Sequence, residues 1–431
     1  MGSTGELLQK LQEGRGDEAL RGLYALDGSD ASLEKGRERA VRVVRAFEAE
    51  FGARPEAALF SGPGRTEIGG NHTDHQHGRV LCGSVDLDML ACAAPNGTDL
   101  VRIQSEGYPA LEVDLRDLKV REEEKNSSPA LVRGVAARLA ELGCRPAGFD
   151  AYVTSTVLSG SGLSSSAAYE ILVATIIDCF FGGGTLDPVE RAKVGQYAEN
   201  VYFGKPCGLM DQMGSSVGGA VAIDFADPAA PVVKKVEYDF TRSGHALCIV
   251  DTGSCHADLT DDYADITREM GAVAAHFGKK FLRDVDEGAF RATLPQLRQE
   301  CGDRAVLRTM HFFEEDCRAE QEAQALEQGD FAAFLALVDQ SGLSSALNLQ
   351  NTWSAAAPQQ QAIPVALAVG RELLGGSGAI RVHGGGFAGT IQAFVPNEKL
   401  ETFQQGMEEL LGPGMCHILH IRPQGGCVVL K

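Results

Sequence analysis

A glycine- and serine-rich segment near the middle of the chain has the composition of a phosphate-binding loop. It follows an alternating segment, 149–158, that predicts a strand, and it runs into a mostly apolar stretch, 167–181, whose length favours a buried helix. Glycines let the backbone approach a ligand, and small hydroxyl residues at a helix N-terminus can bind phosphate oxygens or a cation. The segment therefore predicts a phosphate cradle made of Gly160, Ser161, Gly162, Leu163, Ser164, Ser165 and Ser166. It lacks the Gly-Lys-Ser/Thr of a P-loop, and the alternative is an ordinary loop with a good helix cap.

A second segment, 62–78, is almost entirely small or polar after its first glycines. Its Arg, Asn, His and Asp side chains supply both donors and acceptors, which suits a loop that presents groups to a polyhydroxylated ligand. The side chains in question are Arg65, Asn71, His72 and Asp74. Two alternatives stay open: a solvated loop, or a metal site on His72, His75 and His77, which would need a fourth ligand.

Two carboxylates, Glu199 and Asp211, stand 12 residues apart downstream of the serine segment. Near a phosphate cradle two acids can divide the work, one holding Mg²⁺ and the other facing a nucleophile. Gly208, close to the second acid, keeps backbone space open. The alternative is a surface acid and an unrelated turn acid.

The fourth segment, 383–389, is a His-Gly-Gly-Gly-Phe-Ala-Gly link between two predicted strands. Three consecutive glycines cost backbone entropy on folding, so close approach to a ligand or to another backbone is the economical explanation. We therefore expect Gly384, Gly385 and Gly386 beside a binding site.

The composition excludes several classes of protein. Of 431 residues, 44% are hydrophobic and 23% are charged, which argues against disorder, collagen and coiled coil. The net charge is −20, so we expect no nucleic-acid and no anionic-membrane partner. There is no run of about 18 uncharged apolar residues, and the N-terminus lacks a signal-peptide core. Eleven Cys without CxxC pairs then indicate free thiols in a cytoplasmic protein.

The elements that must position these residues predict an α+β fold in two halves, each a sheet with helices on one face. Residues 5–52 predict helix, and strands at 57–61, 87–93, 100–104 and 111–115 predict an antiparallel meander. The first half continues with a helix at 189–201 and strands at 220–225 and 232–236, and the domain boundary is expected near 235–245. The second half predicts a strand at 246–251, helices at 263–277, 316–328, 331–339 and 358–374, and strands at 379–383, 390–394, 417–421 and 426–430.

In this order and spacing, the four segments resemble the GHMP small-molecule kinases, and within that superfamily most closely the galactokinases. The segment from Pro63 to His75 is similar to the family's Pro-Gly-Arg motif, and 160–167 is a near-complete match to its Gly-Leu-Ser-Ser-Ser-Ala motif. Met210-Asp211-Gln212 matches the catalytic segment, and 384–389 matches the glycine turn with Ala388 in place of one Gly. The resemblance covers about 57–431.

The resemblance implies a two-domain GHMP kinase fold. It implies an N-terminal mixed sheet with helices, similar to domain 2 of ribosomal protein S5, and a C-terminal ferredoxin-like α/β sandwich. The expected division is a helical N-terminal arm at 1–56, an N-terminal domain with the sugar and phosphate motifs at 57–240, and a C-terminal domain at 241–431.

The resemblance also implies transfer of the γ-phosphoryl group of ATP to the anomeric C1 hydroxyl of galactose. Asp211 would be the base or orienting acceptor, Arg65 would neutralise charge, and 160–166 would wrap the phosphates of ATP. Mg²⁺ would be held by Ser165 and Glu199. The sugar would contact Arg65, Asn71, His72, Asp74, Asp211 and Tyr263, with Gly384, Gly385 and Gly386 in a turn near the active site.

Two departures from the family motif leave the substrate open. The family's Glu before His-Thr-Asp is Asn71 here, and the aromatic after Asp is His75. A neutral Asn would tolerate a carboxylate where Glu would repel one, so a galacturonic acid kinase is the alternative to a galactokinase. A non-catalytic sensor of sugar and ATP is a second alternative. The expected partners are small molecules, and the expected state is a monomer or weak homo-oligomer.

Overall fold

The computed structural model describes residues 1–157, 162–205, 207–254 and 259–431. Within these ranges, eight strands form one sheet and four strands form another. The first sheet has the order β12-β1-β2-β5-β3-β4, and β6 pairs with β2 and β7 with β6. Its strands are β1 (Ala58–Gly69), β2 (Arg79–Pro95), β3 (Leu100–Ser105), β4 (Leu111–Asp114), β5 (Phe149–Ser155), β6 (Ala220–Asp224), β7 (Val232–Val236) and β12 (Cys427–Leu430).

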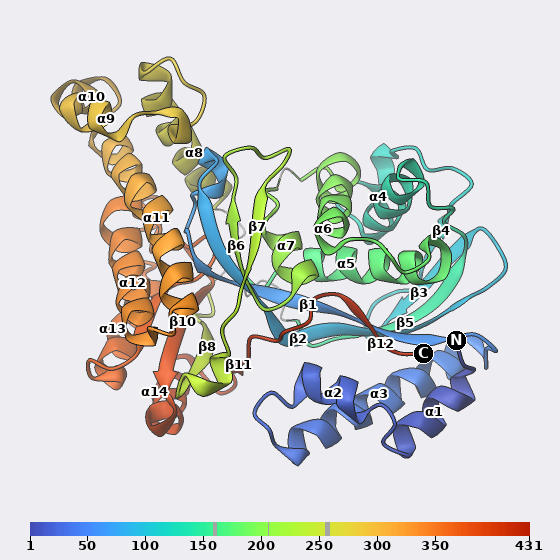
Figure 1. Ribbon diagram of the computed structural model, residues 1–431. Helices are drawn as coiled ribbons and strands as arrows, with labels where there is room; N and C mark the ends of the chain where they lie inside the picture. Colours follow the sequence, from blue (N-terminus) through green and yellow to red (C-terminus); the bar gives the residue numbers. More distant parts are fainter. Residues whose placement is uncertain (158–161, 206, 255–258) are drawn as a thin grey trace.

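Helices cover both faces of this sheet (Figure 1). On one face lie α4 (Ser128–Glu141), α5 (Ser165–Ile177), α6 (Pro188–Tyr197) and α7 (Met210–Val217), with π-helical turns at Asp178–Gly182 and Ala198–Phe203. The other face carries the N-terminal arm, made of α1 (Thr4–Gln12), α2 (Asp17–Tyr24) and α3 (Asp30–Phe51). Successive side chains of β1 point to opposite faces of the sheet. Phe60 packs in the apolar core with residues of α4 and α5, whereas Leu59 packs against the arm. The expectation of helices on one face is therefore wrong for this sheet, because the arm buries its second apolar face.

The second sheet has the order β11-β8-β10-β9, and every adjacent pair in it is antiparallel. Its strands are β8 (His245–Asp251), β9 (Ala379–Val382), β10 (Thr390–Pro396) and β11 (Cys416–Leu419). In chain order this is the 4-1-3-2 arrangement of a ferredoxin-like sandwich, as expected. The helices that follow β8 in the chain are α8 (Thr260–His276), α9 (Glu287–Ala292), α10 (Leu294–Glu300), α11 (Asp303–Glu327), α12 (Phe331–Ser344), α13 (Ala362–Leu374) and α14 (Leu400–Leu411). Of these, α12, α13 and α14 pack on the second sheet.

Two expected strand pairings are wrong, and four helices were not expected. The predicted meander is interrupted because β5 lies between β2 and β3, and it pairs in parallel with β3. The last strand, expected in the second sheet, pairs with β1 at the edge of the first. Sequence patterns also missed α4, α9, α10 and α14. Strand partners are chosen by long-range packing, which local periodicity does not encode.

The segment 62–78 is a loop only in its second part. β1 continues through Pro63 and Arg65 to Gly69, and the chain then turns through a short 3-10 helix, Asp74–Gln76, into β2. Gly62 permits this because a Cβ there would lie 2.5 Å from the Ala168 carbonyl oxygen of α5. The motif therefore lies on a buried strand between the two halves of the molecule.

Among the residues that the structure describes, one helix is apolar and long enough by composition to cross a membrane, Ser165–Gly182. In the structure it is the core helix α5 with its π-helical turn, and it packs against β1 and against the other helices on the same face of the sheet. Its apolar composition is explained by this burial.

Candidate functional site

Arg65 of β1 and Asp211 of α7 are in direct contact. The Nε and Nη2 atoms of Arg65 donate to Oδ1 of Asp211 at 2.9 and 2.6 Å, and its Nη1 donates to the Gly162 carbonyl oxygen. The Ser164 hydroxyl donates to the other carboxylate oxygen, Oδ2, at 2.8 Å. The strand motif, the serine segment and the catalytic segment predicted from sequence are thus joined by one carboxylate.

Local packing explains why these residues meet. Asp211 lies in the first turn of α7, where an acid is favoured by the helix dipole. α7 lies close against β1 because residue 214 is a glycine, whose Cβ would lie 2.8 Å from the Arg65 Cβ. The Arg65 backbone amide donates to the Leu163 carbonyl at 3.0 Å, which holds the start of the serine segment on β1.

The charge of Asp211 is set by its partner. Burial raises the pKa of the carboxyl group, but the adjacent Arg65 guanidinium and the Ser164 hydroxyl outweigh this, so the pKa lies below the ordinary value. Arg65 itself is only 6% exposed. The pair is therefore a guanidinium and an ionised carboxylate at neutral pH, and the carboxylate can accept a hydrogen bond from a hydroxyl.

The serine segment opens α5, as predicted. The structure describes it from Gly162 onward; Gly160 and Ser161 lie outside the described residues. Ser164 has a positive φ of 54° and immediately precedes the 13-residue helix. Gly162 lies against the glycine link of the other half, since a Cβ there would be 3.0 Å from Nδ1 of His383. A helix N-terminus, an arginine and a close glycine contact together suit an anion such as phosphate.

Glu199 lies behind the helix start and is 2% exposed. Its Oε1 accepts from the Ser166 hydroxyl at 3.1 Å and from Lys205 Nζ at 3.4 Å, and its Oε2 accepts from Gln212 Nε2 at 2.8 Å. The same Gln212 amide reaches Glu170 at 3.0 Å. Burial, and then the charge of Glu199, raises the pKa of Glu170 well above its ordinary value.

The residues around Glu199 fit Mg²⁺ only together with a phosphate. Within the described ranges no group of three or more His, Cys, Asp or Glu side chains could hold a metal ion. Mg²⁺ is commonly bound by one or two carboxylates together with substrate phosphate oxygens and waters. A carboxylate and serine hydroxyls at a helix N-terminus match that mode. The serine whose hydroxyl contacts Glu199 is Ser166, and the assignment of Mg²⁺ to Ser165 stays a prediction.

The side chain of Asn71 is enclosed by other residues of the protein. Its side chain is 0% exposed, and its Nδ2 donates to Glu67 Oε1 at 2.8 Å and to the Gly384 carbonyl at 2.7 Å. Its Oδ1 accepts from Asn351 Nδ2 at 2.8 Å and from Ser345 at 3.3 Å. All four hydrogen-bond positions of the side chain are therefore taken by protein, and a contact of Asn71 with the sugar stays a prediction. A Glu in its place would set a second carboxylate against Glu67.

His72 and Tyr263 bind the glycine turn. His72 Nε2 lies 2.8 Å from the Gly385 carbonyl oxygen, and the Tyr263 hydroxyl donates to the Gly386 carbonyl at 2.9 Å. The two rings stack with centroids 6.4 Å apart. Burial, and then the neighbouring His75, lowers the pKa of His72 to about 4. The ring is therefore neutral, and since a carbonyl can only accept, Nε2 carries the proton.

The glycines of the turn are required by close contacts. At Gly385 a Cβ would lie 2.6 Å from the Tyr263 ring, and at Gly386 2.2 Å from the Asn351 carbonyl oxygen. Gly384 and Gly386 have positive φ. The predicted close approach is confirmed, and the approaching groups are the sugar-motif histidine, Tyr263 and Asn351.

Asp74 links this region to the start of α7. A Cβ at Gly208 would lie 2.5 Å from Oδ2 of Asp74, so the turn before α7 packs on the Asp74 carboxylate. Beside them is a cavity of about 300 Å³ that Asp74, Gly208 and Cys207 help to line. His77 stacks on Phe281 with centroids 3.6 Å apart. The three histidines of this motif therefore do not converge on a common point.

Some residues that build the site carry no local sequence signal. Glu315 and His311 on α11 bind the backbone of the sugar motif, and Glu67 and Asn351 bind Asn71. They come from a long amphipathic helix, a strand and a loop, where an isolated Glu, His or Asn is ordinary. Only the tertiary structure brings them together.

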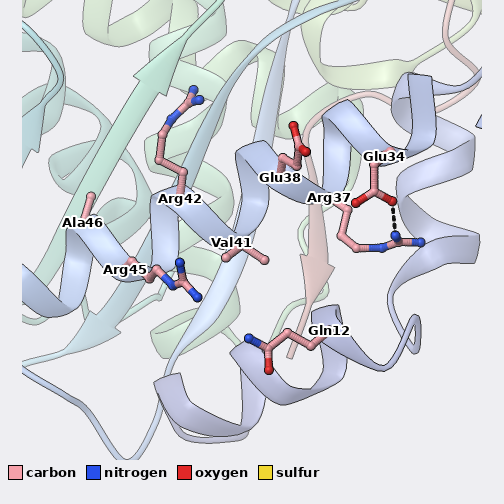
Figure 2. Close-up of a pocket in the computed structure, with 8 residues that line it drawn as sticks. All are labelled: Gln12, Glu34, Arg37, Glu38, Val41, Arg42, Arg45 and Ala46. Carbon is pink, nitrogen blue, oxygen red and sulfur yellow. Dashed lines mark hydrogen bonds and ion pairs between the residues drawn. The ribbon is translucent and has the colours of Figure 1, made fainter. Parts of the chain in front are cut away.

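A groove of about 650 Å³ lies on α3 (Figure 2). The helix α3 is on the opposite face of the first sheet from α7 (Figure 1). Figure 2 shows Arg37 paired with Glu34 along the rim of the groove, and Arg42 and Arg45 project from the same helix. Arg37 also binds Asp17 at 2.7 Å. The groove is a surface feature of the arm and is separate from the cluster described above.

Comparisons with known proteins point to the same segments. Residues 45–95 match the galactokinase galactose-binding signature, and residues 130–219 match the N-terminal domain of GHMP kinases. A galactokinase of Streptomyces coelicolor is 30% identical over 363 residues, which are 84% of this chain and 90% of that protein. The two matches include the Arg65, Glu199 and Asp211 segments, whereas the glycine turn lies outside them.

Solved structures share the fold. A galactokinase of Lactococcus lactis in complex with galactose has a TM-score of 0.74 and 23% identity, covering 89% of this chain and 98% of its own. A mevalonate kinase of Methanococcus jannaschii has a TM-score of 0.61 and 14% identity, covering 85% and 99%. The fold of Figure 1, two sheets with their covering helices, is therefore shared with these two kinases.

Proposed function

Because this chain belongs to the galactokinase family of GHMP kinases, we propose that it transfers the γ-phosphoryl group of ATP to the C1 hydroxyl of galactose. The products are galactose 1-phosphate and ADP. The observation that carries this proposal is the contact of Arg65 with Asp211 beside the N-terminus of α5. It brings an acceptor for a hydroxyl proton next to a site for phosphate.

In the proposed reaction the C1 oxygen attacks the γ-phosphorus, and the bond from that phosphorus to the β,γ-bridging oxygen breaks. The hydroxyl proton passes to Asp211 as the new bond forms. The lowered pKa of Asp211 makes it a weak base in the free protein, which suits an orienting acceptor in a reaction whose transition state needs alignment and charge stabilisation above all. Arg65 and the amides at the start of α5 are proposed to stabilise the charge on the transferred phosphoryl group.

Mg²⁺ bound with ATP supplies charge neutralisation on the β- and γ-phosphates. Glu199, with a hydroxyl of Ser165 or Ser166, is the proposed protein ligand. Residues 160–166 are proposed to wrap the phosphates of ATP. Of these, the structure describes Gly162 to Ser166.

The sugar is proposed to lie among His72, Asp74, Tyr263 and Asp211, with the turn of Gly384, Gly385 and Gly386 closing one side. His72 keeps Nδ1 as an acceptor for a sugar hydroxyl, and Asp74 offers carboxylate oxygens at the edge of a cavity. We further propose that 57–240 and 241–431 act as the two kinase domains, with β12 belonging to the first sheet. The enzyme is proposed to work in the cytoplasm as a monomer or weak homo-oligomer.

The test is turnover of galactose and of galacturonate, side by side, with MgATP. We expect phosphorylation of galactose at C1, and loss of activity when a chelator removes Mg²⁺. The argument for a uronic acid depended on Asn71 facing the substrate, and Asn71 is buried. A strong preference for galacturonate would overturn the choice of sugar, and ATP and galactose binding without turnover would indicate a sensor.

A further inference from the structure

The main chain of the sugar motif is held from behind by helix α11. Glu315 Oε1 accepts from the backbone amides of Gly70 and Asn71 at 3.1 and 3.3 Å. The same oxygen accepts from the Ser341 hydroxyl of α12 at 2.6 Å. Glu315 is fully buried, so these amides and this carboxylate satisfy one another without water.

A second residue one helical turn earlier holds the same loop by its carbonyl. His311 Nε2 lies 2.8 Å from the Asn71 carbonyl oxygen, and its Nδ1 lies 2.9 Å from the Ser344 hydroxyl. A carbonyl oxygen can only accept, so Nε2 is the protonated nitrogen. The peptide groups on both sides of Asn71 are thus fixed by α11.

The fixed loop has an unfavourable backbone. Gly70 has φ 84° and His72 has φ 59°, and the left-handed region is disfavoured for a residue with a Cβ. Such a conformation persists where the surrounding structure determines it. The bonds from Glu315 and His311 lie immediately before His72, at the point where the chain turns out of β1.

The direction of His72 and Asp74 follows from this turn. With His72 in the left-handed region, its ring reaches the Gly385 carbonyl and stacks on Tyr263. Asp74 follows two residues later, against Gly208. A shift of the Gly70–Asn71 peptide would move both side chains that are proposed to face the sugar.

The charge of Glu315 is balanced within the protein. Arg318 on the same helix forms an ion pair with Oε2 of Glu315. Arg381 of β9 forms an ion pair with Glu67 at 2.5 Å, and its positive charge also acts on Glu315. Burial opposes ionisation, but His311, Arg318 and Arg381 outweigh it and lower the pKa of Glu315 to about 2. The carboxylate is therefore a permanent acceptor over the working range of pH.

We propose that Glu315, a residue outside every recognised motif, is a positioning residue for the sugar site: by accepting the Gly70 and Asn71 amides, it sets the placement of His72 and Asp74. This inference rests on the proposed function for the identity of the sugar. It predicts that changes at Glu315 alter galactose binding while leaving ATP binding unchanged.

The test compares Glu315→Gln, which keeps an oxygen that can accept both amides, with Glu315→Leu, which has a similar size and no acceptor. Glu314→Gln is the matched control, because Glu314 is the adjacent and partly exposed residue of the same helix. For the Leu variant we expect KM for galactose to rise about tenfold or more, with KM for ATP within about twofold of the wild type. The Gln variant should retain most of the affinity, and the control should match the wild type.

Two readouts make the result independent of turnover. Hydrogen exchange in the peptide covering 66–78 should speed up in the Leu variant and stay unchanged in the control, with or without sugar. Galactose binding can be followed by the fluorescence of Trp353, the single tryptophan, which follows Asn351 and so reports on the segment that contacts Asn71 and Gly385.

The outcomes separate the inference from the proposed function. If the wild type does not phosphorylate galactose, the proposed function fails, while hydrogen exchange still decides whether Glu315 holds the loop. Unchanged exchange at 66–78 in the Leu variant, or equal losses of galactose and ATP affinity, would overturn the inference. If the Leu variant does not fold, the Gln variant must show slower exchange at 66–78 than a Glu315→Ala variant, or the inference is wrong.

Discussion

Arg65 places two nitrogens on a single oxygen of Asp211, and the Ser164 hydroxyl takes the other oxygen. The Nε and Nη2 contacts both go to Oδ1, so the guanidinium does not form a two-oxygen fork. Oδ2 accepts from a hydroxyl at 2.8 Å. Oδ2 is therefore the oxygen at which a substrate hydroxyl would be accepted, in exchange for the serine.

Replacing Asp211 by Asn tests this arrangement without changing its shape. The amide cannot accept a proton, and its nitrogen would face either Arg65 or the incoming hydroxyl. We expect kcat to fall by about 100-fold or more, as is typical when a proton acceptor is lost. Binding of ATP, measured by calorimetry, should persist. A variant that kept more than about a tenth of wild-type turnover would contradict the role of Asp211.

Replacing Asn71 by Asp tests whether this residue is structural or binds the ligand. The new carboxylate would face Glu67 and the Gly384 carbonyl oxygen, both of which now accept from the amide. We expect a loss of about 3–5 kcal/mol in the free energy of unfolding, the usual cost of an uncompensated buried charge. Denaturant unfolding measures it.

The second variant for this prediction is Asn71→Asp combined with Glu67→Gln. The side-chain amide introduced by the Glu67→Gln change can donate to the new carboxylate, so part of the stability should return. If Asn71→Asp instead changed the affinity for galactose and left stability intact, Asn71 would lie in the sugar site after all.

The contacts of Asp211 with Arg65 and the serine segment could be predicted from the sequence because the signals of these segments are local. Glycines and serines before an apolar helix, an arginine after Pro-Gly and an acid at a helix start are each set by neighbours in the chain. Arg65 and Asp211, which are 146 residues apart, are found in contact as the motifs implied. The order of the motifs along the chain was sufficient to predict this contact, because the resemblance to the family implies that the two motifs meet.

The burial of Asn71 could not be predicted in the same way. A run of small polar residues has the composition of an exposed loop, but its first part is the interior of β1 and its second part is covered by α11, α12 and the glycine turn. The partners of Asn71 lie up to 313 residues away. Burial of a polar group depends on such partners, which no local pattern contains.

The N-terminal arm is explained by the sheet that it covers. Arg39 of α3 binds Asp88 of β2 at 2.5 Å, where the acid also accepts from Tyr24 at 2.7 Å and lies 3.3 Å from Arg422. Asp88 is 0% exposed. The arm, the first sheet and the C-terminal segment therefore share one buried carboxylate.

Replacing Arg39 by Met keeps the aliphatic packing and removes the charge. We expect a loss of about 3–5 kcal/mol in the free energy of unfolding, since one partner of a buried pair is removed. Arg42→Met on the exposed side of the same helix is the control, and it should change stability by less than about 0.5 kcal/mol. Equal effects of the two variants in denaturant unfolding would show that the Asp88 contact adds nothing.

His420 gives the fold a pH-dependent contact between β2 and the C-terminal segment. Its Nδ1 lies 2.8 Å from Asp86 Oδ2, and its backbone amide donates to Oδ1 of the same acid at 3.0 Å. The hydrogen bond to Asp86 raises the pKa of His420 above the ordinary value of 6.5, against a smaller opposing effect of burial, and Asp27 adds to the rise. The protonated form is thus favoured in the folded protein.

The sign of the effect on stability follows from linkage. The stabilising contribution of His420 is fully present below the pKa of the unfolded chain and is lost as pH rises through the higher folded-state pKa. His420→Gln removes it, so the Tm difference between wild type and variant should be larger at about pH 5.5 than at about pH 8.5. His417 on β11 should behave in the opposite way, because burial lowers its pKa and its protonation opposes folding in acid. Thermal melts of wild type, His420→Gln and His417→Gln at both pH values test the pair, and parallel curves for all three proteins would contradict it.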